Sequence, residues 1–183
     1  EEKVEAVLLV FMDEEEIVKR YKQAHAAKLM HQVCLGGLLE HVVSLCGLID
    51  HVQQNYPWLN RDLLIAGAFL HDLGKVHELE YERSIDYTDC GKLLGHIAIG
   101  LKMLDRKSQD IEDFPFNLKL LLEHVLLSHH GQLEFGSPVQ PATAEALMFH
   151  LLDNADSKME AIRQALEETE ATQIWTDRVR AVG

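Results

Sequence analysis

Cysteine and proline are scarce in this sequence, which has three cysteines and four prolines in 183 residues. Cys34, Cys46 and Cys90 are odd in number, far apart and outside any Cys-x-x-Cys pair, which excludes a disulfide framework and a thiolate metal site. The remaining composition, 47% hydrophobic and 26% charged, is typical of a folded globular protein and excludes a disordered or fibrous chain.

Long apolar runs are absent too, since no stretch approaches the roughly 18 residues that a membrane-spanning helix needs. The opening segment EEKVEAVLLVFMDEEE has acidic flanks where a signal peptide has basic ones. Both absences predict a cytoplasmic protein without a membrane partner, and no oligomeric state is predicted. The length predicts one domain over residues 1–183. A start without methionine suggests part of a longer protein.

Positive charge is in deficit, because 17 lysines and arginines face 30 aspartates and glutamates, a formal net charge of −13. Proteins that hold long nucleic acids gain most of their binding free energy when Lys and Arg neutralise phosphates. The chain is therefore not expected to hold a long nucleic acid by charge alone. A phosphate-bearing substrate would require cations from another source.

The sequence pattern predicts an all-α fold, because alternation of apolar and polar residues is nearly absent and glycine and proline separate helical stretches. Asn60 and Thr143 are the clearest candidates for helix N-caps. The expected helices cover approximately residues 13–29, 35–55, 60–73, 92–107, 117–130 and 143–168.

Ionisable residues take core positions in these predicted helices. His41, for example, lies on the apolar face that Leu38 and Leu45 define by their spacing of three and four residues. Further ionisable groups lie on inward faces, or at the ends of such helices, at His71, Asp72, His96, His129, His130 and Asp153.

A single core histidine is more often a hydrogen-bonded structural residue than a metal ligand. An unpaired buried polar group, however, costs about 1–3 kcal/mol, so five helices that each place ionisable groups in apolar positions indicate a common partner. A bound metal is such a partner. Histidine and aspartate without thiolates suit manganese, iron or zinc, and seven candidate ligands exceed the needs of one tetrahedral zinc. Two divalent metal ions fit the number of ligands better.

The order His, His-Asp, His, His-His, Asp resembles the HD-domain superfamily of metal-dependent phosphohydrolases. Five blocks, at 35–45, 66–79, 87–97, 127–138 and 151–159, are similar to the HD domain of YhaM-type 3′-to-5′ exoribonucleases. This resemblance covers about residues 31–175 and implies an HD-domain helical bundle with a metal site between helices. It also implies an OB-fold module upstream in a longer chain. One departure is His31-Gln32, where the family has paired histidines.

The resemblance implies particular roles for the candidate residues. Two cations can hold a bridging hydroxide at neutral pH and bind the non-bridging oxygens of a phosphodiester, and Asp72 would bridge them. Lys75 would meet a phosphate oxygen, and Phe135 could stack on a base. The expected ions are manganese, with iron and zinc as alternatives. The implied ligands are His41, His71 and Asp153 for one ion, and His96, His129 and His130 for the other.

The leading hypothesis is a two-metal phosphodiesterase that releases nucleoside 5′-monophosphates from the 3′ end of single-stranded RNA. An alternative is a phosphohydrolase for a nucleotide or cyclic dinucleotide, which the charge of −13 favours because a short substrate needs fewer cationic contacts. A di-iron oxygenase and a metal-free helical interaction module are further alternatives. Asp156 and His124 could support the ligands or be structural, and His150 is expected to be a packing or surface residue.

Overall fold

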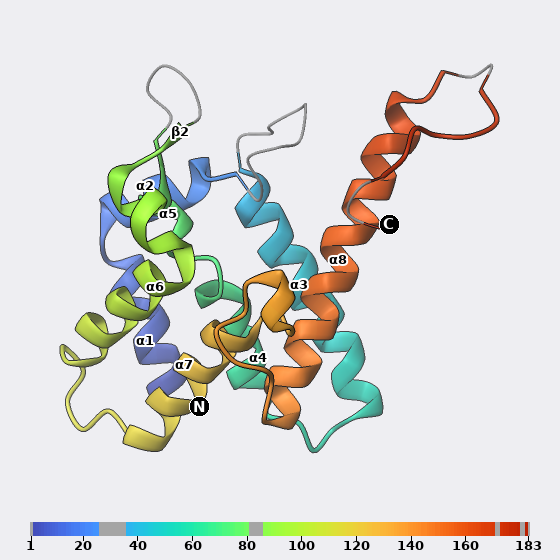
Figure 1. The fold of residues 1–183 in the computed structure, drawn as a ribbon. Helices are drawn as coiled ribbons and strands as arrows, with labels where there is room; N and C mark the ends of the chain where they lie inside the picture. Colours follow the sequence, from blue (N-terminus) through green and yellow to red (C-terminus); the bar gives the residue numbers. More distant parts are fainter. Residues whose placement is uncertain (1, 26–35, 81–85, 171–172, 180–181, 183) are drawn as a thin grey trace.

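A computed structural model describes residues 2–25, 36–80, 86–170, 173–179 and 182 (Figure 1). The described residues are mainly helical, which confirms the predicted all-α class. None of the described helices has the length and apolar character that crossing a bilayer requires. The elements are, in order, α1 (Glu2–Met12), α2 (Glu15–Gln23), α3 (Gly37–Asn55), α4 (Arg61–Leu70), α5 (Lys75–Glu78), β1 (Leu79–Glu80), β2 (Asp86–Tyr87), α6 (Asp89–Ser108), α7 (Phe116–Ser128), the 3-10 turn η1 (Leu133–Phe135) and α8 (Ala144–Glu168).

The structure confirms most of the predicted helices and corrects the N-terminal part. The helix predicted over residues 13–29 is α2, which ends at Gln23, and α1 precedes it where no helix was predicted. Ala24 and His25, which the prediction included, are not helical, and residues 26–29 lie outside the described residues, as do Leu35, Cys34 and the His31-Gln32 pair. The short antiparallel pair of β1 and β2 lies between the helices predicted over residues 60–73 and 92–107, where the sequence predicted no regular element.

Both predicted N-caps are confirmed. The Asn60 side chain accepts a hydrogen bond from the Leu63 amide at 3.1 Å, and the Thr143 hydroxyl accepts one from the Ala146 amide, also at 3.1 Å. Each bond satisfies an amide that the first helical turn leaves without a partner. These caps fix where α4 and α8 begin; His71 directly follows the end of α4, and Asp153 lies in the first half of α8.

Helix α4 lies within the hydrophobic core, and α1, α3, α7 and α8 pack against it (Figure 1). Its Leu63, Leu64 and Leu70 are fully or almost fully buried, as is Phe149 of α8. Burying a side chain of this size stabilises the fold by about 1.5–3 kcal/mol. Because the core holds α4 on several sides, the residues that follow Leu70 have a fixed position.

Gly74 follows the predicted 60–73 helix, a position that suggests a glycine at which the helix stops and the chain turns away. The structure gives it a different role. It has ordinary right-handed torsions (φ −60°, ψ −20°), and the chain enters α5 at once, so the glycine does not turn the chain away. A Cβ atom at this position would lie 2.0 Å from the His96 carbonyl oxygen and 2.8 Å from the Gly100 nitrogen. Gly74 therefore permits close contact between the turn after α4 and helix α6.

Candidate metal centre

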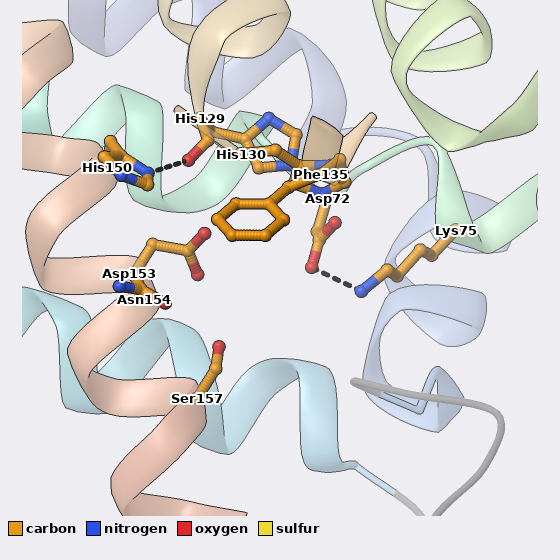
Figure 2. A pocket seen from close by; sticks show the side chains of 9 residues that line it. All are labelled: Asp72, Lys75, His129, His130, Phe135, His150, Asp153, Asn154 and Ser157. Atoms are coloured by element: carbon orange, nitrogen blue, oxygen red, sulfur yellow. Dashed lines mark hydrogen bonds and ion pairs between the residues drawn. The ribbon is translucent and has the colours of Figure 1, made fainter. Parts of the chain in front are cut away.

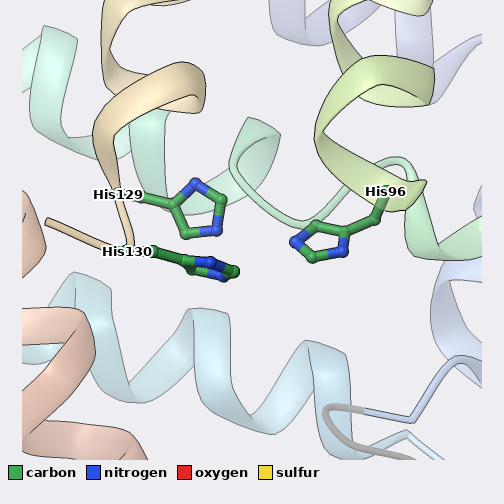
Figure 3. A group of neighbouring side chains, drawn as sticks. All are labelled: His96, His129 and His130. Carbon is green, nitrogen blue, oxygen red and sulfur yellow. The ribbon is translucent and has the colours of Figure 1, made fainter. Parts of the chain in front are cut away.

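The structure brings the seven candidate ligands into one cluster. His41 from α3, His71 from the end of α4 and Asp153 from α8 form one group. His96 from α6 and the adjacent His129 and His130, just after α7, form a second group (Figure 3). Within each group, the possible ligand atoms all lie within 4.8 Å of one another. Residues that are up to 112 positions apart in sequence thus meet in space.

Asp72 lies between the two groups. Its Oδ2 atom is 3.3 Å from His71 Nε2 in the first group, and its Oδ1 atom is 3.4 Å from His96 Nε2 in the second. One carboxylate oxygen therefore faces each group. Lys75 Nζ donates a hydrogen bond to Asp72 Oδ2 at 2.6 Å.

Local backbone geometry positions the histidines of the second group. Helix α6 is interrupted at Gly95, whose torsions (φ 72°, ψ 162°) are not helical and are unfavourable for residues with a Cβ atom. His96 consequently begins a new helical segment and faces the cluster. After α7, Gly131 has a φ of 77°, and the chain turns immediately after His129 and His130.

An oxygen atom accepts from the Nδ1 side of each clustered histidine. The acceptors are the Ala68 carbonyl for His71 at 3.0 Å, the Leu126 carbonyl for His129 at 2.7 Å, the Phe135 carbonyl for His130 at 2.9 Å, Glu78 for His96 at 3.3 Å and Asp156 for His41 at 2.7 Å. Because Nδ1–H donates, the Nε2 atom of each neutral ring carries the lone pair. Metal-binding histidines usually donate their other ring N–H to such an oxygen atom, which fixes the orientation of the ring.

Three of these Nε2 atoms are buried and have no hydrogen-bond partner among the described residues: those of His71, His96 and His129. Leaving a buried polar atom without a partner costs about 1–3 kcal/mol. Divalent metal ions at the centre of the two groups would satisfy all three atoms at once. The donor set, imidazole nitrogens with carboxylates, therefore fits the metal that the sequence predicts.

Electrostatics favours the ligand forms of the central residues. Burial, together with the neighbouring His71, lowers the pKa of His129 to about 3, so this ring is neutral at physiological pH and its lone pair is available. Burial opposes ionisation of Asp72, but the charge of Lys75 and the neighbouring His71 outweigh it and hold the pKa of this carboxyl well below its usual range. His41 is the exception: burial opposes the charged form, but the Asp153 and Asp156 carboxylates outweigh it and raise its pKa, so a metal ion would have to displace a proton from this ring.

Several supporting residues were missed or left open by the sequence. Glu78 accepts from the His96 backbone amide at 3.0 Å and also faces its ring, and this role depends on the interruption at Gly95, which leaves no periodic signal. Asp156 does orient His41, whereas His124 is structural, because its Nε2 accepts from the Ala142 amide at 2.8 Å.

A cavity of about 250 Å³ opens beside the cluster (Figure 2). Phe135, which is 60% exposed, projects into it from η1. His150 was expected to be a packing or surface residue; it borders the cavity, and its Nδ1 donates a hydrogen bond to the His129 carbonyl at 2.8 Å. The lining residues are Asp72, Lys75, His129, His130, Phe135, His150, Asp153, Asn154 and Ser157.

Comparison with known proteins gives consistent matches. The family model for the HD domain matches residues 38–158. The chain is 43% identical over 157 residues to the 3′-5′ exoribonuclease YhaM of Bacillus subtilis. This alignment covers 86% of the present chain and 49% of the relative. It is 41% identical over 170 residues to the same-named protein of Geobacillus sp., covering 91% of this chain and 52% of the relative. The chain thus spans about half the length of these curated relatives. The comparison with solved structures gave no match.

Proposed function

The chain belongs to the HD domain family, and from this premise we propose that it is a metal-dependent phosphodiesterase that removes nucleotides from the 3′ end of single-stranded RNA. The main support is the position of Asp72 between two ligand groups that leave three buried Nε2 atoms without partners. The substrate is proposed because similar curated proteins carry the name 3′-5′ exoribonuclease.

We propose that the two groups hold one divalent ion each, with Asp72 shared between them. His41, His71 and Asp153 would ligate the first ion, and His96, His129 and His130 the second. Manganese is the proposed ion, with iron or zinc as alternatives that the same ligands accept. When bound, such ions supply Lewis-acid activation of a phosphodiester and a nucleophile at neutral pH.

Lys75 is proposed to bind a phosphate oxygen of the substrate. It borders the cavity next to Asp72, and although burial opposes its charge, the attraction of Asp72 outweighs it and raises its pKa. The side chain therefore stays protonated. An ammonium group at this position stabilises the negative charge that develops on phosphate as the P–O bond breaks.

Phe135 is proposed to stack on the base of the terminal nucleotide. Its exposed ring lies over the cavity (Figure 2), and stacking on an aromatic ring contributes about 1–3 kcal/mol per base with little sequence preference. With a net charge of −13, this chain should make few contacts with the remainder of a long RNA. A separate OB-fold module in the longer protein is proposed to supply those contacts.

A nucleotide phosphohydrolase is the second candidate function, favoured by the small cavity and by the charge of −13. The manganese-loaded protein should be offered single-stranded RNA, single-stranded DNA, cyclic dinucleotides and nucleoside triphosphates, with products identified by mass. Nucleoside 5′-monophosphates released stepwise from RNA support the proposal. Turnover confined to the small nucleotides contradicts it and supports the second candidate.

Replacing Lys75 by alanine should lower RNA hydrolysis by about 10²-fold, the usual effect of removing one group that stabilises transition-state charge. Bound metal should change little, because Lys75 is not proposed as a ligand. Steady-state rates and metal analysis of the same preparation test this, with Lys158→Ala on α8 as a matched control. Loss of metal from the Lys75 variant would show that the residue is structural.

A further inference from the structure

One buried carboxylate next to the cluster belongs to neither ligand group. Glu78, the last residue of α5, is only 8% exposed. Its Oε1 atom accepts a hydrogen bond from the His96 backbone amide at 3.0 Å and lies 3.3 Å from Nδ1 of the same ring. A carboxylate is costly to bury unless such partners compensate for the water that it loses. Both contacts lead to one candidate ligand, so this carboxylate acts on the cluster through His96.

The backbone on both sides of Glu78 fixes the position of its side chain. The Glu78 carbonyl oxygen accepts from the Thr88 amide at 2.9 Å, and a Cβ atom at Gly91 would lie 2.2 Å from that oxygen. The end of α5 and the start of α6 are therefore in close contact. The interruption at Gly95 leaves the His96 amide at the start of a new helical segment, where an acceptor is needed. The Glu78 carboxylate caps this segment and orients the His96 ring at the same time.

The two ligand groups differ in their negative charge. The first contains the Asp153 carboxylate, and a further carboxylate, Asp156, lies 2.7 Å from Nδ1 of His41. The second group consists of three imidazoles, two of which face neutral backbone carbonyl oxygens. Among the residues that the structure describes, only Asp72 and Glu78 bring a carboxylate oxygen within 4 Å of an imidazole nitrogen of this second group. Since Asp72 is shared, a divalent ion in the second group would depend on Glu78 for further negative charge.

We propose that Glu78 is the positioning residue of the second ligand group and sets the affinity of the ion that this group binds. A carboxylate that accepts from one nitrogen of a metal-binding histidine fixes the ring and makes the other nitrogen a stronger ligand. Glu78 acts in this way through His96 and is not itself a ligand. This inference rests on the proposed function, because it concerns an ion proposed for the same site.

The test is calorimetric titration of the metal-free protein with manganese chloride. In Glu78→Gln, one ion should bind as in wild type, and the other should bind about 10-fold to 100-fold more weakly, the usual effect of losing such a partner. Glutamine has nearly the same shape, and its carbonyl oxygen can still accept from the His96 amide, so the thermal stability of the metal-free protein should change little. Glu80→Gln, which alters an exposed glutamate of β1, is the matched control.

Two further backgrounds identify the ion that is affected. In His41→Ala, which leaves the second group intact, Glu78→Gln should weaken binding of the remaining ion by the same factor. In His96→Ala, which leaves the first group intact, Glu78→Gln should not change binding of the remaining ion. The Glu78→Gln single variant should also recover RNA hydrolysis close to the wild-type rate at saturating manganese, because the residue acts on ion binding and not on the substrate.

Unchanged affinity for both ions in Glu78→Gln would overturn the inference, as would equal weakening of both ions, which would assign Glu78 a structural role for the whole cluster. Glu78→Asp is a second variant that keeps the charge, and it should retain both ions. Loss of the second ion from a folded aspartate variant would contradict the charge argument. If wild type does not hydrolyse RNA, the proposed function fails. If it hydrolyses RNA but Glu78→Gln binds both ions normally, only this inference fails.

Discussion

Replacing Asp72 by asparagine should abolish RNA hydrolysis, with a loss of at least about 10³-fold, while the helical fold remains. The carboxylate directs one oxygen to each ligand group, at 3.3 Å from His71 and 3.4 Å from His96. An asparagine of the same shape offers one carbonyl oxygen and no charge, so it can serve at most one group. Two-metal catalysis requires both ions near the scissile phosphate, so the loss should exceed that for a single charge-stabilising donor.

The measurement combines turnover on a short RNA with circular dichroism of the same preparation. Asp50→Asn is a matched control, because this exposed aspartate pairs with Arg61 on the surface, away from the cluster. Near-normal turnover in the Asp72 variant would refute a shared ligand at this position. Loss of helical signal would instead assign Asp72 a structural role.

Replacing Gly74 by alanine should destabilise the protein by about 2–4 kcal/mol, a loss equal to or larger than the usual cost of overpacking a core. The new Cβ atom would lie 2.0 Å from the His96 carbonyl oxygen, and backbone atoms cannot relieve this overlap by changing rotamer. Helix α6 would have to move away from the turn after α4. Because His96 is the residue in contact, the second ligand group should lose its geometry first.

Urea unfolding of the metal-free variant measures the loss of stability, and metal analysis measures the effect on the cluster. Gly47→Ala in α3 is a matched control, since no atom lies within 4 Å of the position that its Cβ would take. That substitution should stabilise the protein by about 0.5–1 kcal/mol, because alanine favours the helix. A Gly74 variant as stable as wild type would contradict the close contact.

The sequence reveals the candidate ligands better than it reveals the residues that support them. His41 and Asp153 were recognisable because an ionisable group on an apolar helix face conflicts with burial, and spacing alone reveals that conflict. Glu78 could not be found in this way. Its contact with His96 depends on non-helical torsions at Gly95, and a single torsion change has no periodic signature.

The errors in the fold have similar causes. Helix α1 contains the continuous apolar run VLLVF, which obscures the three-and-four spacing of an amphipathic helix, although Val4, Val7 and Phe11 are its buried face. Gly74 directly follows the predicted 60–73 helix, a position where glycine commonly ends a helix. Its actual constraint is a contact with α6, which is formed only by tertiary packing.

The number of metal ions bound per chain tests the two-metal assignment most directly. Protein loaded with manganese and dialysed should contain two ions per chain by elemental analysis. His41→Ala, which alters the first ligand group, and His96→Ala, which alters the second, should each retain about one, because each group has its own three ligands. A wild-type protein with one ion or none, or a variant that keeps both, would contradict the assignment.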